Sequence, residues 1–222
     1  YYLSSVVSVA RMQHLPTFKE KVKQYAQNAS MALLNYPVLM AADILIYKAD
    51  AVPVGIDQEP HLEIAREIAR KMNSEYGMNF PKPTRFVTAG EYVPSLTGEG
   101  KMSKSVEGSF INLTDSLTTI EKKLAQAPTD VGKGHSIPTV GGVANLLKLV
   151  ELFQGESRVV EYKKQYLSSG IFYGDLKKEL ALSIYSQLEP IQVKRQELAS
   201  QPHKIDLLIK EGAAKAQKIA KQ

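Results

Sequence analysis

Residues 51–72 read AVPVGIDQEPHLEIAREIARKM, and the class of fold follows from this segment. It begins with a short apolar run that closes at Gly55, which predicts a buried strand, although Pro53 suits a strand end or an edge better. The residues that follow predict a helix over 59–72, because apolar residues recur there at helical spacing. That apolar face carries Leu62, Ala65, Ile68, Ala69 and Met72. A strand that leads directly into a helix indicates an α/β fold.

The flanking segments predict further helices and a second strand. Thr17 and Glu20 have the spacing of a capping box at a helix start. The apolar residues that follow at helical spacing are Phe18, Val22, Tyr25 and Ala26. Pro37 suits the first turn of a second helix that runs to about residue 47. Downstream, residues 86–88 (Phe-Val-Thr) are a strand candidate.

The character of the chain changes at residues 95–109. This tract is polar and basic, is flanked by glycines and lacks periodicity, which predicts a loop with freedom to move. Beyond Thr114 the periodicity predicts helices only, with Pro190 kinking or breaking the long run after Asp175. We therefore expect an α/β domain over 1–112, a helical domain over 113–203 and a closing helix over 204–222.

Composition narrows the class of protein. The 222 residues are 44% hydrophobic and 23% charged and include no cysteine, which excludes disulfides, thiolate metal sites and cysteine nucleophiles. A cytoplasmic protein is expected, because small secreted domains usually need disulfides. The longest nearly apolar stretch, residues 31–47, contains Asn35, Pro37 and Asp43, so it predicts a buried core segment and no membrane span.

The charge is unevenly distributed. The net charge is +5, of which residues 1–112 contribute +1 and residues 113–222 contribute +4. A basic helical half is compatible with an anionic partner such as a nucleic acid. A solvated helical surface is the alternative explanation.

One predicted helix carries an acid among apolar residues. Tyr36, Met40, Asp43 and Tyr47 share one face, and Asp43 is the only charged residue in 31–47. A carboxylate inside an apolar helix costs several kcal/mol unless a donor satisfies it. It could cap backbone or pair with a distant arginine. Alternatively, the face lines a pocket in which Asp43 accepts a hydrogen bond from a ligand N–H.

The strand end offers a second candidate site. Ligands of open α/β sheets bind beyond the carboxyl ends of the strands, where glycine allows close approach of the backbone. Asp57 and Gln58 lie there, two and three residues after Gly55, and could bond hydroxyl, amine or carboxylate groups. An ordinary strand-to-helix turn is the alternative.

The third candidate is Lys101-Met102-Ser103-Lys104-Ser105 in the glycine-flanked loop. Two lysines on a mobile loop can move onto a triphosphate and neutralise charge that develops on the leaving pyrophosphate. The hydroxyl and backbone N–H groups add donors. A solvated basic loop is the alternative.

These motifs carry a family resemblance. The matching stretches are YPVLMAADILIY (36–47), VPVGIDQEPHLE (52–63), KMSKS (101–105), YGDLK (173–177) and GAAKA (212–216). The sequence resembles the class I aminoacyl-tRNA synthetases, and among them the bacterial tryptophanyl-tRNA synthetases, over essentially the whole chain. The tyrosyl family shares the fold and a similar Gly-x-x-Asp-Gln pattern, whereas the Met-Ala-Ala-Asp helix is similar to the tryptophan family.

The resemblance implies a Rossmann-like nucleotide-binding fold, of which 1–112 is the second half, followed by an anticodon-binding-type helical domain over 113–203. The helix over 204–222 is then expected to pack back towards the catalytic domain. Asp43 matches the residue that reads the indole N–H of tryptophan, with Met40 and Ile44 in the pocket wall. Tyr36 and Gln58 match residues that hold the polar end of the amino acid.

The resemblance also implies an ATP site. Its residues are Gly55, Ile56, Asp57, Val93, Lys101, Met102, Ser103, Lys104 and Ser105, of which Lys101, Ser103 and Lys104 are the catalytic candidates. The implied activity is that of a tryptophan–tRNA ligase, which activates tryptophan with ATP and transfers it to tRNA(Trp). Mg²⁺ arrives with ATP and no protein metal ligand is expected. A homodimer is implied, with helices within 17–47 at its interface.

One departure from the family pattern is the class signature His-x-Gly-His, which this sequence lacks; its histidines are His14, His61, His135 and His203. We therefore expect the chain to be the C-terminal portion of a longer enzyme and inactive in isolation, with roughly the first half of a doubly wound fold missing. His61 is expected to be a packing or supporting residue. The alternative functions are a non-catalytic RNA-binding or dimerisation module and a tyrosine-specific enzyme.

Overall fold

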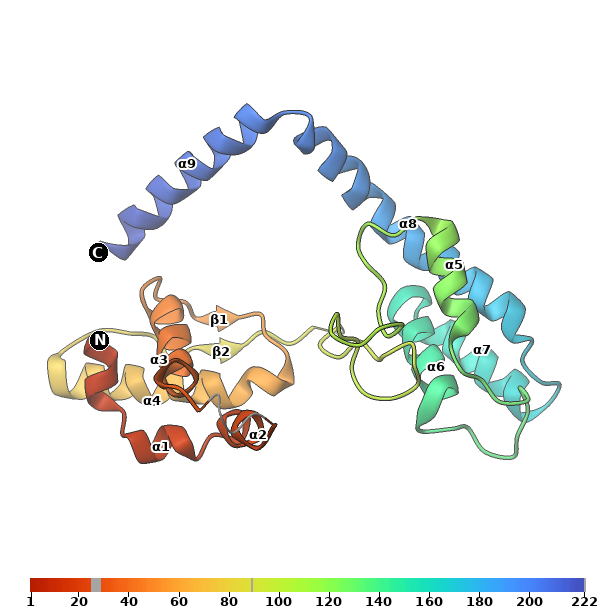
Figure 1. Ribbon diagram of the computed structural model, residues 1–222, viewed down its shortest axis with the longest axis horizontal. Coiled ribbons are helices and arrows are strands. Elements are labelled where there is room, and N and C mark those ends of the chain that lie inside the picture. Colours follow the sequence, from red (N-terminus) through yellow and green to blue (C-terminus); the bar gives the residue numbers. More distant parts are fainter. Residues whose placement is uncertain (25–28, 89, 222) are drawn as a thin grey trace. The chain divides into compact units, whose positions relative to one another are not determined.

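The chain forms two compact units in the computed structural model, which describes residues 1–24, 29–88 and 90–221 (Figure 1). Unit 1 comprises Tyr1–Glu91 and Leu208–Gln222, and unit 2 comprises Tyr92–Leu207. Residues 101–105 therefore lie in unit 2, because the chain around them packs against the core of that unit. The functional boundaries at 112/113 and 203/204 stay predictions.

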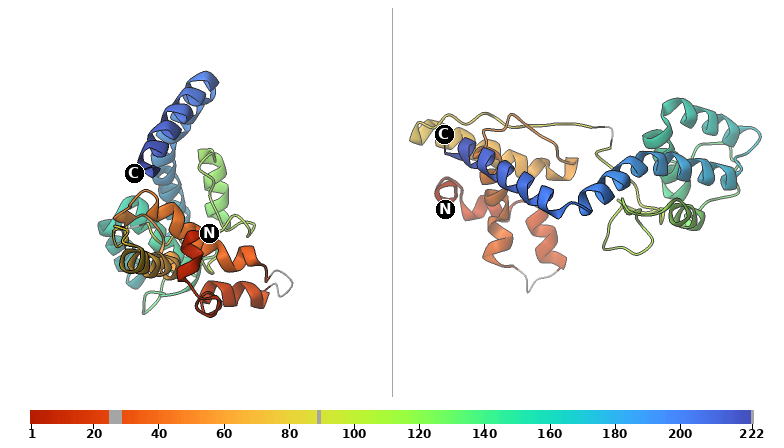
Figure 2. Two further views of the ribbon diagram at one scale, coloured as in Figure 1. Left: turned by 90° about the vertical axis from the view of Figure 1, so that its left-hand side faces the viewer. Right: turned by 90° about the horizontal axis from the view of Figure 1, so that it is seen from above.

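Unit 1 is built around two packed helices. Its elements are η1 (Tyr2–Val6), α1 (Val9–Gln13), α2 (Pro16–Gln24), α3 (Met31–Leu45), β1 (Ala51–Val52), η3 (Ile56–Gln58), α4 (Glu59–Tyr76) and β2 (Thr84–Arg85). Helix α3 crosses α4, as Figures 1 and 2 show, and the two helices bury their apolar faces against each other. All five residues predicted on the apolar face of α4 are buried. The helix continues past the predicted end to Gly77, whose positive φ of 64° ends it.

The two strands pair in parallel, which confirms the α/β class. Ala51 lies opposite Thr84 and Val52 opposite Arg85. The first strand is shorter than predicted because Pro53 has no N–H to donate. The strand predicted at 86–88 is wrong: the paired residues are Thr84–Arg85, and the ladder ends where the N–H of Phe86 donates to the carbonyl oxygen of Val52 at 2.9 Å.

Two local predictions at helix starts are wrong. Helix α2 begins at Pro16, so Thr17 lies inside it and its hydroxyl contacts His61 instead of capping the helix. Helix α3 begins earlier than expected, at Met31, because Ser30 caps it by accepting a hydrogen bond from the N–H of Leu33 at 3.2 Å. Pro37 therefore lies inside α3. Of the apolar residues predicted in the first helix, residues 25 and 26 lie outside the described residues.

Unit 2 is helical, as predicted for the chain beyond Thr114. It contains α5 (Leu117–Gln126), α6 (Gly141–Gln154), α7 (Glu156–Leu167) and α8 (Tyr173–Ala199), while α9 (Pro202–Ala220) begins in unit 2 and ends in unit 1. Pro190 lies inside α8 and does not end it. The side chains at the centre of the core are Ile120, Leu124, Leu146, Leu149, Val150, Leu176, Leu180 and Ile184. Within the described ranges, no helix is both long and apolar enough to cross a membrane.

The close approach of α6 to the preceding loop yields a stability prediction. A Cβ on Gly142 would lie 1.9 Å from the carbonyl oxygen of Pro128. We expect Gly142→Ala to lower the free energy of unfolding by about 1–3 kcal/mol, because the backbone must shift to admit the methyl group. Thermal and urea unfolding followed by circular dichroism measure the change.

Gly212→Ala is the matched control. Gly212 lies inside α9, and no atom comes within 4 Å of the position of its Cβ. We expect this variant to be unchanged or stabilised by about 0.5–1 kcal/mol, since alanine favours the helix. Equal stability of the two variants would contradict the packing argument.

Candidate functional site

A buried imidazole joins the two segments predicted to bind the polar end of an amino acid. His61, in the first turn of α4, is only 2% exposed. Its Nε2 lies 2.6 Å from the Tyr36 hydroxyl on α3 and 3.0 Å from the Thr17 hydroxyl on α2. Its Nδ1 lies 3.0 Å from Oε1 of Gln58 at the end of η3. The structure therefore brings Tyr36 and Gln58 to opposite sides of one ring.

The environment of His61 favours its neutral form. Burial lowers the pKa of the imidazole below its usual value, and the negative charge of Asp57 opposes this shift only in part. The role expected from the sequence, that of a packing or supporting residue, agrees with this burial. The three-residue spacing from Gln58 is a signal of that contact in the sequence. No sequence pattern links His61 to Tyr36, which lies 25 residues away.

The face of α3 that carries the candidate tryptophan-binding residues lies at the edge of the core. Tyr36 and Met40 are half-buried, Ile44 is buried in the core, and Asp43 is exposed. The carboxylate of Asp43 is therefore not desolvated in this chain. Among the described residues, Asp43 makes neither a capping hydrogen bond nor an ion pair with an arginine. Its carboxylate is free to accept a hydrogen bond from a ligand.

The turn between β1 and α4 places polar groups beside Gly55. A Cβ on Gly55 would lie 2.6 Å from Oδ1 of Asp57, so a larger residue there would displace this carboxylate. Oδ2 of Asp57 accepts a hydrogen bond from Nε2 of Gln58 at 3.1 Å. Ile56 is exposed on the same turn. The turn thus presents a carboxylate and an amide whose orientations are coupled.

In unit 2, the base of the loop over 101–105 pairs with the segment that contains Val93. Pro94 and Lys101 form an antiparallel bridge, and the N–H of Met102 donates to the carbonyl oxygen of Val93 at 2.9 Å. Val93 and Met102 also pack against the core of unit 2. The structure therefore brings Val93 together with the loop, as expected if both contact one nucleotide.

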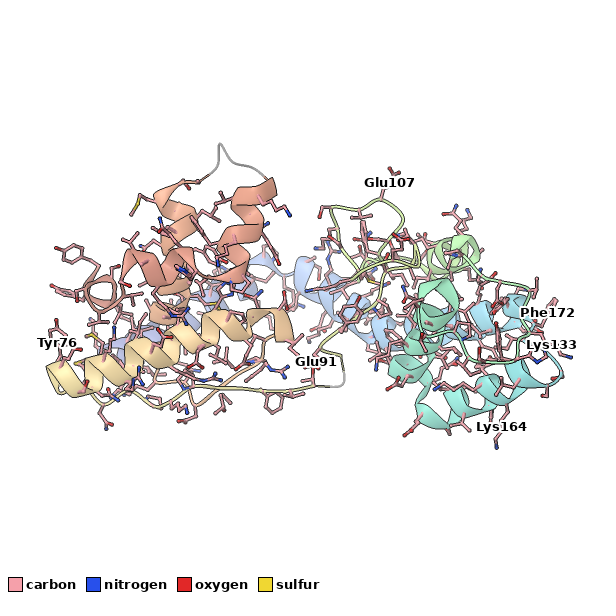
Figure 3. The ribbon with its side chains drawn as sticks, turned by 90° about the horizontal axis from the view of Figure 1, so that it is seen from below. Tyr76, Glu91, Glu107, Lys133, Lys164 and Phe172 are labelled. Atoms are coloured by element: carbon pink, nitrogen blue, oxygen red, sulfur yellow. The ribbon has the colours of Figure 1, made fainter. Side chains whose placement is uncertain are left out.

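A residue that the sequence did not single out fixes the conformation of this loop. Ser109 is 1% exposed; its hydroxyl donates to the carbonyl oxygen of Ser103 at 2.6 Å and accepts from the N–H of Ser103 at 3.2 Å. Residues 104–108 are exposed, and Figure 3 labels Glu107 on this segment. The loop predicted to be free to move is thus tied at its base. Lys104 is exposed beyond the tie.

The side chains that could ligate a metal ion do not cluster in the part of the chain that the structure describes. No group of three His, Asp or Glu side chains in the described ranges lies close enough together to hold a metal ion. Of the residues singled out in the sequence, those in unit 1 carry carboxylate, amide and phenol groups, and those in the loop of unit 2 include two lysines. Lysines suit the charge stabilisation of an anionic group.

Comparison with known proteins places the chain in a family. The family model described as tRNA synthetases class I (W and Y) matches residues 1–189. The chain belongs to this family of class I tRNA synthetases.

Its curated relatives are tryptophan–tRNA ligases. The enzyme of Porphyromonas gingivalis is 37% identical over 99% of this chain and 68% of its own length. The enzyme of Clostridium acetobutylicum is 39% identical over 99% of this chain and 67% of its own length. The crystal structure of the Campylobacter jejuni tryptophanyl-tRNA synthetase, complexed with ADP and tryptophan, is similar with a TM-score of 0.76 and 34% identity. That match covers 99% of this chain and 68% of the Campylobacter chain.

The tie at Ser109 yields a prediction for the loop. Ser109→Ala removes both side-chain hydrogen bonds to Ser103. In the natural gene product that carries this sequence, we therefore expect the KM for ATP to rise by about threefold to tenfold in ATP–pyrophosphate exchange. The KM for the amino acid should stay unchanged, because the residues proposed to bind it lie in unit 1. Ser168→Ala, at the exposed end of α7, is the matched control. An unchanged KM for ATP in Ser109→Ala would show that the tie does not position the loop.

Proposed function

We propose that the chain functions in the ATP-dependent activation of L-tryptophan and its transfer to tRNA(Trp). The observation that carries this proposal is the match of nearly the whole chain to tryptophan–tRNA ligases at 37–39% identity. In the reaction, a carboxylate oxygen of tryptophan bonds to the α-phosphorus of ATP while the bond from that phosphorus to the pyrophosphate breaks. A ribose hydroxyl of the tRNA then attacks the activated carbonyl carbon and AMP leaves.

Unit 1 supplies the proposed amino-acid site. The unpaired carboxylate of Asp43 accepts a hydrogen bond from the indole N–H, and Met40 and Ile44 contribute apolar wall. Tyr36 and Gln58 bind the polar end. A site built around an acceptor rejects an amino acid that lacks the donor far better than an apolar pocket rejects one of different size.

The proposed ATP-binding residues come from two stretches of the chain. Gly55, Ile56 and Asp57 contact the nucleotide on the turn before α4, and Val93 contacts the adenine through its backbone. Lys101, Met102, Ser103, Lys104 and Ser105 form the phosphate-binding loop. Lys101, Ser103 and Lys104 stabilise the charge that develops on the leaving pyrophosphate. Mg²⁺ accompanies ATP and adds to that stabilisation when bound.

The remaining proposals concern partners. The excess of positive charge in residues 113–222 supports a role of the helical part in binding the anionic tRNA. We also propose a homodimer, with the helices within 17–47 at its interface, and a cytoplasmic location, as the family resemblance implies.

Tryptophan-dependent ATP–pyrophosphate exchange tests the proposal. The natural gene product that carries this sequence should exchange label with tryptophan and should not do so with tyrosine. Exchange with tyrosine instead would identify the tyrosine-specific alternative. Binding of RNA without any exchange would identify the non-catalytic module. The polypeptide 1–222 assayed alone tests the expectation that it is inactive in isolation.

The proposed role of Asp43 makes a specific prediction. We expect Asp43→Ala to lower kcat/KM for tryptophan by about 100-fold or more, because the indole N–H loses its charged acceptor. The KM for ATP should change little. Asp206→Ala, an exposed aspartate on α9, is the matched control. Unaffected tryptophan activation in Asp43→Ala would exclude the role of this carboxylate.

A further inference from the structure

The hydrogen bonds around His61 determine which ring nitrogen carries the proton. Nε2 of Gln58 donates to Oδ2 of Asp57 at 3.1 Å, and this contact orients the amide. The opposite orientation would set the amide oxygen against a carboxylate. The amide oxygen therefore faces Nδ1 of His61 at 3.0 Å, and Nδ1 must carry the proton to donate to it.

The assignment fixes the role of Nε2. In the neutral ring only one nitrogen is protonated, so Nε2 is an acceptor. Two hydroxyls lie within hydrogen-bond distance of it: Tyr36 at 2.6 Å and Thr17 at 3.0 Å. The shorter contact identifies the phenol as the principal donor. The proton of the Tyr36 hydroxyl therefore points into the protein, towards His61.

The orientation of that proton changes what Tyr36 offers to a ligand. With its proton committed to His61, the phenol oxygen presents only lone pairs outward. Oε1 of Gln58 likewise retains a second lone pair beside the one used by His61. Two neutral acceptors on either side of one ring suit a group with several N–H donors and a positive charge, such as an ammonium.

We propose that His61 is the positioning residue that makes Tyr36 and Gln58 a paired acceptor for the α-ammonium group of the amino-acid substrate. The inference rests on the proposed function, in which Tyr36 and Gln58 bind the polar end of the amino acid, and adds the residue that orients them. His61 itself is buried and acts only through its two partners. It therefore sets the affinity for the amino group and not the rate of the transfer at phosphorus.

The pairing depends on the charge of the ring. Protonated His61 has no acceptor nitrogen, so the Tyr36 hydroxyl must turn its proton outward, towards the ammonium. Among the described residues, the titratable groups that face or act on His61 are Tyr36 on α3 and Asp57 on η3. Burial holds the pKa of His61 below the ordinary histidine value of about 6.5. The KM for tryptophan should therefore stay constant as the pH falls to that value and rise only below it, where the neutral form is lost.

Variants of His61 test the inference in the natural gene product that carries this sequence. His61→Phe removes both contacts, so the KM for tryptophan should rise by about tenfold while kcat and the KM for ATP change by less than about threefold. His61→Gln restores an oxygen near the position of Nε2 and should recover most of the loss. His61→Asn keeps a donor only for Gln58 and should not. His14→Phe is the matched control, because His14 is an exposed histidine directly after α1.

Substrate analogues separate recognition of the ammonium from a general structural effect. Tryptamine keeps the ammonium and lacks the carboxylate, whereas indole-3-propionate keeps the carboxylate and lacks the ammonium. We expect His61→Phe to weaken binding of tryptamine by about tenfold and to leave binding of indole-3-propionate unchanged. Equal weakening of both analogues would overturn the inference.

A measurement on the unsubstituted protein covers the case in which the variants do not fold. Nitrogen-15 NMR of labelled histidine should show Nδ1 protonated and Nε2 unprotonated at pH 7.5, and the reverse tautomer would overturn the inference. Absence of tryptophan-dependent exchange in the unsubstituted protein would instead reject the proposed function. Tryptamine binding and the tautomer would still decide the role of His61.

Discussion

The packing of α3 against α4 determines where the side chains proposed to bind the amino acid lie in unit 1. The two helices bury apolar side chains against each other, and His61 is a buried polar side chain among them. A buried imidazole is stable only where its nitrogens find partners, because each unsatisfied polar group costs free energy on burial. Tyr36, Gln58 and Thr17 provide those partners. The requirement to satisfy one ring thus sets the positions of two side chains proposed to bind substrate.

In unit 2, the hydroxyl of a buried serine holds the loop over 101–105 in place. The loop with the two lysines must present cations to solvent, so its lysines cannot anchor it by burial. Ser109 is buried instead, and it holds both the N–H and the carbonyl of Ser103. Val93 and Met102 add apolar contacts at the base. An exposed cationic segment is in this way attached to a packed helical core.

The sequence predicted the features that depend on periodicity and on strong motifs. The buried face of α4 follows from apolar spacing, and the family follows from residues 36–47, 52–63 and 101–105. Features that depend on contacts between residues far apart in the chain could not be predicted from the sequence. Thr17 has the spacing of a helix cap, yet its hydroxyl is used by His61, 44 residues away. The second strand lies two residues earlier than predicted, because its register depends on hydrogen bonds to Asp50 and Val52.

The exposure of the Asp43 carboxylate in the candidate site also could not be predicted from the sequence. Its position on an apolar helix was evident from the sequence, but its exposure depends on which elements cover that face. No sequence pattern identifies Ser109 as the residue that anchors the loop, since a serine after a glycine is typical of many turns.

The double hydrogen bond from Ser109 has a consequence for a chain that is cut. Lys104 lies on an exposed segment, where trypsin-like proteases cleave most readily. A break after Lys104 leaves one new end one residue from Ser103 and the other end leading into Ser109, with the serine pair intact between them. Because Val93, Leu96 and Met102, which precede the cut, pack against the core of unit 2, the nicked polypeptide would stay assembled and migrate as one species until it is denatured.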